Sequence, residues 1–130
     1  MRVVAALIRQ GDRLLVCQRR EGGPFPLKWE FPGGKVEAGE GNLEALSREL
    51  REELEIEVLS AEEVFRHRHG YLEGAQVELI FFRVGDYRGA VANRAFRQIS
   101  WAGPEELKSL DFLEGDLPLV DRLVRQGLQW

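Results

Sequence analysis

The segment from Gly33 to Ile56 constrains the fold more than any other part of the chain. It reads GGKVEAGEGNLEALSRELREELEI, and its second half predicts a helix over about 43–54, because leucines recur every three or four residues. These leucines are Leu43, Leu46, Leu50 and Leu54. Glu49, Glu52 and Glu53 are spaced i, i+3 and i+4, so their side chains share a neighbouring face of the helix. Three carboxylates this close repel one another unless a cation lies between them, which suggests a hard divalent ion such as magnesium.

A solvated acidic helix is the alternative explanation for this pattern. In that case Arg48 and Arg51 offset the glutamates through local ion pairs worth about 0.2–0.5 kcal/mol each. The preceding segment, Trp-Glu-Phe-Pro-Gly-Gly-Lys over 29–35, argues against it. A Pro-Gly-Gly turn lets the backbone pass close to a ligand, so the two segments together predict a binding site.

The spacing of these residues resembles the Nudix box, G-x5-E-x7-R-E-U-x-E-E-x-G-U, in which U is aliphatic. The matching residues are Gly34, Glu40, Arg48, Glu49, Leu50, Glu52, Glu53 and Ile56. One position departs, because Glu55 stands where the box has its second glycine. The resemblance extends over nearly the whole chain. It implies an α/β protein of the Nudix fold, an α/β/α sandwich with a mixed sheet.

The resemblance also implies a hydrolase that uses a divalent metal ion, Mg²⁺ or Mn²⁺, to cleave the diphosphate of a nucleotide derivative. Its expected metal ligands are the carbonyl of Gly33 and the carboxylates of Glu49, Glu52 and Glu53. The candidate catalytic residues are Glu52, Glu49 and Arg48, with Arg48 orienting a carboxylate. Metal-bound hydroxide is the expected nucleophile, and Glu52 is the candidate proton acceptor.

Two further positions of the box have expected structural roles. Glu40 is expected to tie the loop to the start of the helix. Glu55 follows the helix at a position that favours a left-handed backbone, and a non-glycine residue in that conformation costs roughly 1 kcal/mol. That cost affects stability and leaves the ligands intact.

MutT-like members of the family carry a fourth glutamate about six residues before a late tryptophan. Counting back from Trp101 gives Ala95, and no acidic residue lies between Asp86 and Glu105. A separate loop base is therefore missing unless another acidic residue folds over the site. The candidates are Glu73, Asp111 and Glu114.

The segment over 29–35 also resembles MutT-like members, which convert a nucleoside triphosphate to a monophosphate and pyrophosphate. The resemblance implies that Phe31 lines the base pocket, that Asp116 reads the base edge and that Arg19 points toward the ligand. From the residues alone, Asp116 is better explained as the N-cap of the helix over 117–127, although both roles could coexist, and Arg19 also fits a strand end. The expected substrate is an oxidised or pyrimidine nucleoside triphosphate. The alternatives are another nucleoside diphosphate-linked compound and a non-catalytic nucleotide-binding or sensor domain.

Composition limits the class of protein. At 130 residues with a net charge of −4, the chain predicts a single domain over 1–130 whose partner is a small nucleotide and not a nucleic-acid polymer. The apolar run over 3–8 is too short for a signal region or a membrane span, so we expect a cytoplasmic protein, either a monomer or a homodimer. Cys17 is expected to be a buried structural thiol. His67 and His69 share one strand face and are expected to pack there, although they could also bind a metal.

Periodicity and turn residues predict the remaining elements. The expected strands are 2–9, 13–19, 29–31, 57–71, 75–84, 88–92 and 96–101, and the later helices are 105–110 and 117–127. A hairpin turn is expected at Leu72-Glu73-Gly74. Either Gly41 or Asn42 caps the acidic helix, and Asn42 has the better side chain for this role.

Overall fold

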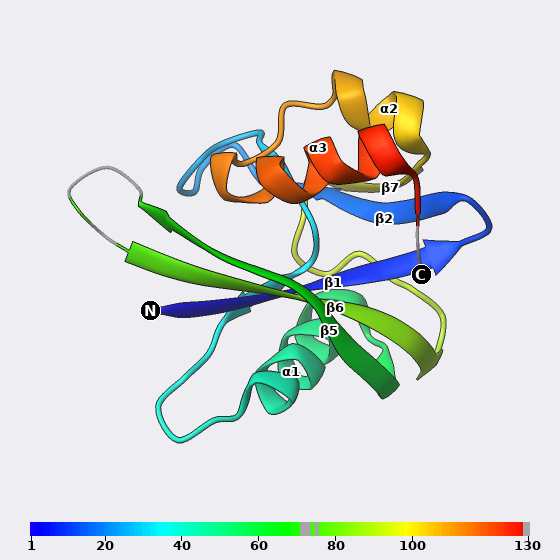
Figure 1. The fold of residues 1–130 in the computed structure, drawn as a ribbon. Helices are drawn as coiled ribbons and strands as arrows, with labels where there is room; N and C mark the ends of the chain where they lie inside the picture. The colour runs from blue at the N-terminus through cyan, green and yellow to red at the C-terminus, as the bar shows by residue number, and fades with distance from the viewer. Residues whose placement is uncertain (71–73, 75, 129–130) are drawn as a thin grey trace.

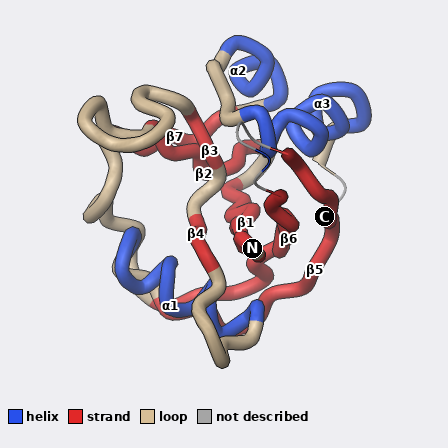
Figure 2. The backbone as a smooth tube through the Cα atoms, turned by 90° about the vertical axis from the view of Figure 1, so that its left-hand side faces the viewer, coloured by secondary structure: helices blue, strands red, loops and turns tan. Residues whose placement is uncertain are grey.

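The fold is a mixed β-sheet with helices on both faces, as the Nudix resemblance implies. The structure, a computed structural model, describes residues 1–70, 74 and 76–128. Helix α1 (Asn42–Leu54) covers one face of the sheet, and helices α2 (Pro104–Ser109) and α3 (Leu117–Gln126) cover the other (Figures 1 and 2). The α/β/α sandwich is therefore confirmed.

Strand β1 is the centre of the sheet. The strands are β1 (Arg2–Gln10), β2 (Arg13–Gln18), β3 (Trp29–Glu30), β4 (Gly33–Lys35), β5 (Glu57–Gly70), β6 (Gln76–Arg88) and β7 (Gln98–Ala102). β1 pairs in parallel with β6 and antiparallel with β2 and β4. β5 pairs with β6, while β3 and β7 pair with β2. The glycine pair therefore lies in a short strand directly beside β1.

Two apolar cores lie on opposite faces of the sheet, because side chains of a strand alternate between its faces. Val4, Ala6 and Ile8 of β1 lie on the α1 side, while Ala5 and Leu7 face α2 and α3. β1 is thus buried on both faces, which explains its continuous apolar run. On α1 the buried leucines are Leu46, Leu50 and Leu54. The expected stripe is wrong at its first member, since Leu43 is 49% exposed.

The N-cap of α1 is one of the two residues that the sequence left open. Gly41 and not Asn42 is the N-cap, and its backbone N–H donates to the carboxylate of Glu44 at 3.3 Å. The Asn42 side chain instead accepts a hydrogen bond from the guanidinium of Arg2. The better capping side chain of the two therefore binds a distant residue of β1 and not the helix start.

The expected strand over 88–92 is wrong, because β6 continues to Arg88 and an irregular loop follows. The backbone amides of Ala92 and Arg94 donate to the carbonyls of Leu54 and Glu53, each at 2.9 Å. The last carbonyls of a helix lack partners within the helix, so this loop satisfies two of them. Its amides are used by α1 and not by a neighbouring strand.

Smaller differences concern other element ends. β4 was not expected, and β7 begins at Gln98 because the side chain of Asn93 binds the backbone of Phe96 on both sides, at 2.9 Å each. Leu72 and Glu73 of the expected hairpin turn lie outside the described residues. Cys17 is fully buried, as expected. Within the described part of the chain, no helix is both long and apolar enough to span a membrane.

Candidate active site

The glycine pair of β4 lets two glutamates of α1 approach the backbone closely. Gly33 has φ +155°, and a Cβ built on it would lie 1.9 Å from the carbonyl oxygen of Val4. Its N–H donates to Oε1 of Glu53 at 3.1 Å. A Cβ on Gly34 would lie only 2.5 Å from the carboxyl carbon of Glu49. The missing Cβ of Gly34 therefore leaves room for the Glu49 carboxylate, while the missing Cβ of Gly33 lets β4 lie close to the main chain of β1.

Arg48 connects the loop and the helix at this site. Its Nε and Nη2 donate to the two carboxylate oxygens of Glu40 at 2.7 and 2.9 Å, and Nη2 also donates to the carbonyl of Lys35 at 3.0 Å. Its Nη1 donates to Glu49 at 2.9 Å and lies 3.6 Å from a carboxylate oxygen of Glu52. The Arg48 hydrogen bonds hold the pKa of Glu40 down at about 2. The guanidinium thus contacts carboxylates on both sides of the turn.

Glu53 is the most perturbed carboxyl group of the helix. Burial, together with the nearby Glu49 and Glu30 carboxylates, raises its pKa to about 9, while the Gly33 hydrogen bond opposes the rise. Negative charge therefore gathers around a buried carboxyl group, which is the environment that a hard divalent cation stabilises.

Glu30 is a residue that the sequence reasoning missed. It lies in β3 and forms an ion pair with Arg19, whose Nη1 is 3.0 Å from its Oε1. Burial raises the pKa of Glu30, and Arg19 opposes the rise. The available signal was a charged residue between Trp29 and Phe31 in an otherwise apolar strand.

The carboxylates do not form a ready metal cage. Among the described residues, no group of three or more His, Cys, Asp or Glu side chains is arranged to hold a metal ion. Glu49 accepts from Arg48 and Glu53 accepts from the Gly33 amide through Oε1 in each case, so Oε2 of both carboxylates could serve an ion. The oxygen donors fit magnesium chemically. The ligand set of Gly33, Glu49, Glu52 and Glu53 stays a prediction.

Two adjoining cavities lie beside the glycine pair and Glu53. The first, about 430 Å³, has mostly apolar walls and is lined by Arg19, Phe31 and Asp116, along with Gly33 and Gly34. The second, about 220 Å³, is lined by Glu53, Ala95 and Arg20. Arg19, Pro24 and Glu30 line both cavities. The structure therefore brings the three predicted substrate-binding residues together, but Glu49 and Glu52 line neither cavity.

Asp116 lines the first cavity, as expected, but its side chain does not cap α3. It stands at the N-cap position of α3, yet its side chain makes no capping hydrogen bond. Its Oδ2 instead accepts from the backbone N–H of Phe31 at 3.1 Å, and the residue is 5% exposed. Burial raises its pKa to about 7, opposed by the Phe31 hydrogen bond. The expected capping role is wrong, because the Asp116 carboxyl group accepts from the Phe31 amide, directly after β3, and from no amide of α3.

The candidate loop bases lie elsewhere in the described structure. Asp111 pairs with Lys28 at 2.8 Å, and Glu114 lies 3.4 Å from Nε2 of His69. Neither residue lines the cavity that contains Glu53 and Ala95. Glu73 lies outside the described residues.

Comparison with known proteins identifies the family. A family model described as NUDIX domain matches residues 1–123. The CTP pyrophosphohydrolase of Escherichia coli (strain K12) is 36% identical over 119 residues, which cover 92% of this chain and 87% of that protein. The 8-oxo-dGTP diphosphatase of Haemophilus influenzae is 33% identical over 127 residues, with coverage of 97% and 93%. The solution structure of the E. coli ORF135 protein superposes with a TM-score of 0.83 at 34% identity, covering 98% of this chain and 92% of that one. The chain therefore belongs to the Nudix family.

Proposed function

We propose that this protein hydrolyses a nucleoside triphosphate to a nucleoside monophosphate and pyrophosphate with the help of Mg²⁺ or Mn²⁺. The main support is the pair of adjoining cavities. The larger is apolar and falls within the usual size of ligand sites, roughly 300–1,000 Å³, so it suits a nucleobase and sugar. The smaller contains Glu53 and suits the phosphates. Arg19 lies on both walls, where base and phosphate would meet.

The reaction transfers a phosphoryl-linked group to water. A bond forms between the water oxygen and one phosphorus of the α–β anhydride while the P–O bond from that phosphorus to the bridging oxygen breaks. The leaving group takes the bridging oxygen and the electron pair: it is the nucleoside monophosphate after attack on the β-phosphorus and pyrophosphate after attack on the α-phosphorus. A bound divalent ion neutralises phosphate charge and lowers the pKa of water. Glu49, Glu53 and the carbonyl of Gly33 would hold it together with Glu52. Arg48 would orient Glu49, and Glu52, whose side chain is 61% exposed, would accept the water proton.

Asp116 is proposed to read the base. Only the Phe31 amide, among the described residues, donates to its carboxyl group, so the second oxygen can serve a ligand. An ionised Asp116 accepts from an exocyclic amino group, and a protonated one donates to a base carbonyl or ring nitrogen. Because its pKa is about 7, both forms occur near neutral pH. The names of the relatives favour cytosine or 8-oxoguanine nucleotides as the first substrates to test.

The test is release of pyrophosphate and phosphate from a panel of normal and oxidised nucleotides, with magnesium and with a chelator. We expect pyrophosphate from one preferred triphosphate, loss of turnover in the chelator, and a kcat at least about 100-fold lower in Glu52→Gln. Glu62→Gln, an exposed glutamate on β5, is the matched control.

Products other than pyrophosphate would indicate a different class of substrate. Phosphate release or dinucleotide cleavage would keep the metal site and replace the proposed substrate by another diphosphate-linked compound. No turnover by folded wild-type protein would refute the hydrolase and favour a nucleotide-binding domain, consistent with Ala95 at the cavity wall.

A further inference from the structure

His67 binds the turn that carries Asp116, although the two residues come from different parts of the chain. It lies in β5 with its side chain half-buried, and its Nε2 is 2.7 Å from the carbonyl oxygen of Gly115. A carbonyl oxygen only accepts hydrogen bonds, so Nε2 is the donor. Gly115 immediately precedes Asp116 in the short 3₁₀ turn Glu114–Asp116.

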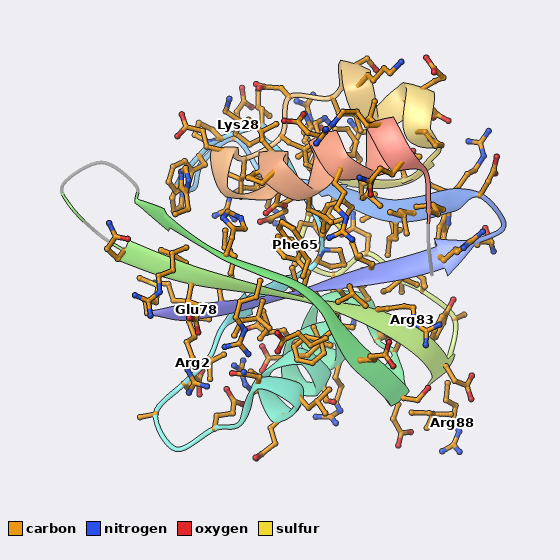
Figure 3. All side chains as sticks on the ribbon, in the orientation of Figure 1. Arg2, Lys28, Phe65, Glu78, Arg83 and Arg88 are labelled. Atoms are coloured by element: carbon orange, nitrogen blue, oxygen red, sulfur yellow. The ribbon has the colours of Figure 1, made fainter. Side chains whose placement is uncertain are left out.

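The His67 ring also belongs to an aromatic cluster behind Phe31, which lines the base cavity. It stacks on Phe81 with 4° between the ring planes and 6.3 Å between centroids. Phe81 in turn meets Phe31 edge to face at 6.3 Å. Phe65 lies 5.6 Å from the His67 ring, on the sheet face that α3 covers (Figure 3). Aromatic neighbours thus hold the imidazole ring in the orientation in which its Nε2 binds the turn.

These contacts link Phe31, Asp116, Gly115, His67 and Phe81 in a continuous ring that returns to Phe31. Phe31 donates its amide hydrogen to Asp116, Gly115 adjoins Asp116 and accepts from His67, and the His67 ring returns to Phe31 through Phe81. His67 itself is not among the residues that line the base cavity. Its effect on a ligand would therefore pass through the turn.

We infer that His67 is a positioning residue that fixes where the Asp116 carboxyl group stands in the base cavity, and thereby contributes to the choice of nucleotide. The inference rests on the proposed function, because it assumes that Asp116 reads the base. Its geometric part, the hold on the turn, is independent of turnover.

Two variants separate the hydrogen bond from the ring. His67→Phe keeps an aromatic ring on Phe81 and removes the donor, whereas His67→Gln keeps an N–H donor at a similar reach and removes the ring. Arg68→Gln is the control, because Arg68 lies on the opposite face of β5 with a side chain that is 78% exposed.

The first measurement is KM and kcat of each variant for the preferred nucleotide and for a poorer one. We expect His67→Phe to raise KM for the preferred nucleotide by about tenfold and to change kcat by less than about twofold. The ratio of kcat/KM between the preferred and the poorer nucleotide should therefore fall. His67→Gln and Arg68→Gln should stay close to wild type. A His67→Phe enzyme with wild-type KM, or a His67→Gln enzyme equally impaired, would overturn the inference.

The second measurement is amide hydrogen exchange at Phe31, which needs no activity. His67→Phe should speed exchange at Phe31 by about tenfold, while His67→Gln should not, and the Ala92 amide on Leu54 should be unchanged as a check on global stability. If wild type hydrolyses no nucleotide, the proposed function fails and this exchange alone decides the positioning role. Equal Phe31 exchange in all proteins would refute it.

Discussion

Replacing Asp116 by Asn tests the burial of this carboxyl group through the pH dependence of stability. The folded state raises its pKa from 3.8 to about 7, so the folded protein binds this proton more tightly than the unfolded chain does. The stability that the protonated group supports is complete below pH 3.8 and is lost as pH rises through about 7. At 1.36 kcal/mol per pH unit the full loss is about 4 kcal/mol, of which about 3 kcal/mol falls between about pH 5 and pH 8.5.

Asparagine cannot ionise, yet its side-chain oxygen can still accept the Phe31 amide. We therefore expect the free energy of unfolding of Asp116→Asn, relative to wild type, to increase by about 3 kcal/mol from about pH 5 to pH 8.5. Urea unfolding of both proteins at a series of pH values measures this difference, in which contributions of other titrating groups cancel. Parallel stability curves would show that the carboxyl group is ionised without cost, and the reasoning from burial would be wrong.

Four other substitutions test the C-terminal end of α1 and the loops beside the site. Glu55→Gly should raise the free energy of unfolding by about 1 kcal/mol, because the cap residue has φ 58°; an unchanged thermal midpoint would contradict the strain. Gly34→Ala should lower kcat while leaving the fold intact, since the new Cβ displaces only the Glu49 carboxylate, whereas Gly33→Ala should fail to fold because its Cβ meets main chain. Circular dichroism measures the folding of both variants, and kcat measures the activity of Gly34→Ala. A fully active Gly34→Ala would count against Glu49 as a metal ligand. Ala95→Glu should raise kcat by about tenfold or more if a loop base is the missing part, and an unchanged kcat would show that the site works without one.

The acidic helix α1 could be predicted because its signals are local. The spacing of the leucines and glutamates follows the helical period, and the loop glycines precede it directly, so α1 and its ligand candidates needed no tertiary information. The left-handed conformation of Glu55 was also predictable, since the position directly follows the helix.

Other features depend on partners far along the chain. Asn42 is a better capping residue than Gly41, but Arg2 in β1 binds its side chain. Asp116 has capping chemistry, but the Phe31 amide is its partner across 85 residues of chain. Glu30 gave no local sign that Arg19 would pair with it beside two cavities. In each case a tertiary contact decided the role of a side chain whose local chemistry allowed another.

The backbone and the side chains of the loop after β6 have different roles. Its amides at Ala92 and Arg94 donate to the C-terminal carbonyls of α1, including that of Glu53, while Ala95 lines the smaller cavity beside Glu53. A main-chain bond is available to every residue except proline, so mutation can change the chemistry of this loop without detaching the helix that it supports. Related proteins could therefore gain or lose a cavity-facing side chain here in single steps, and this loop is a suitable place for directed evolution of the site.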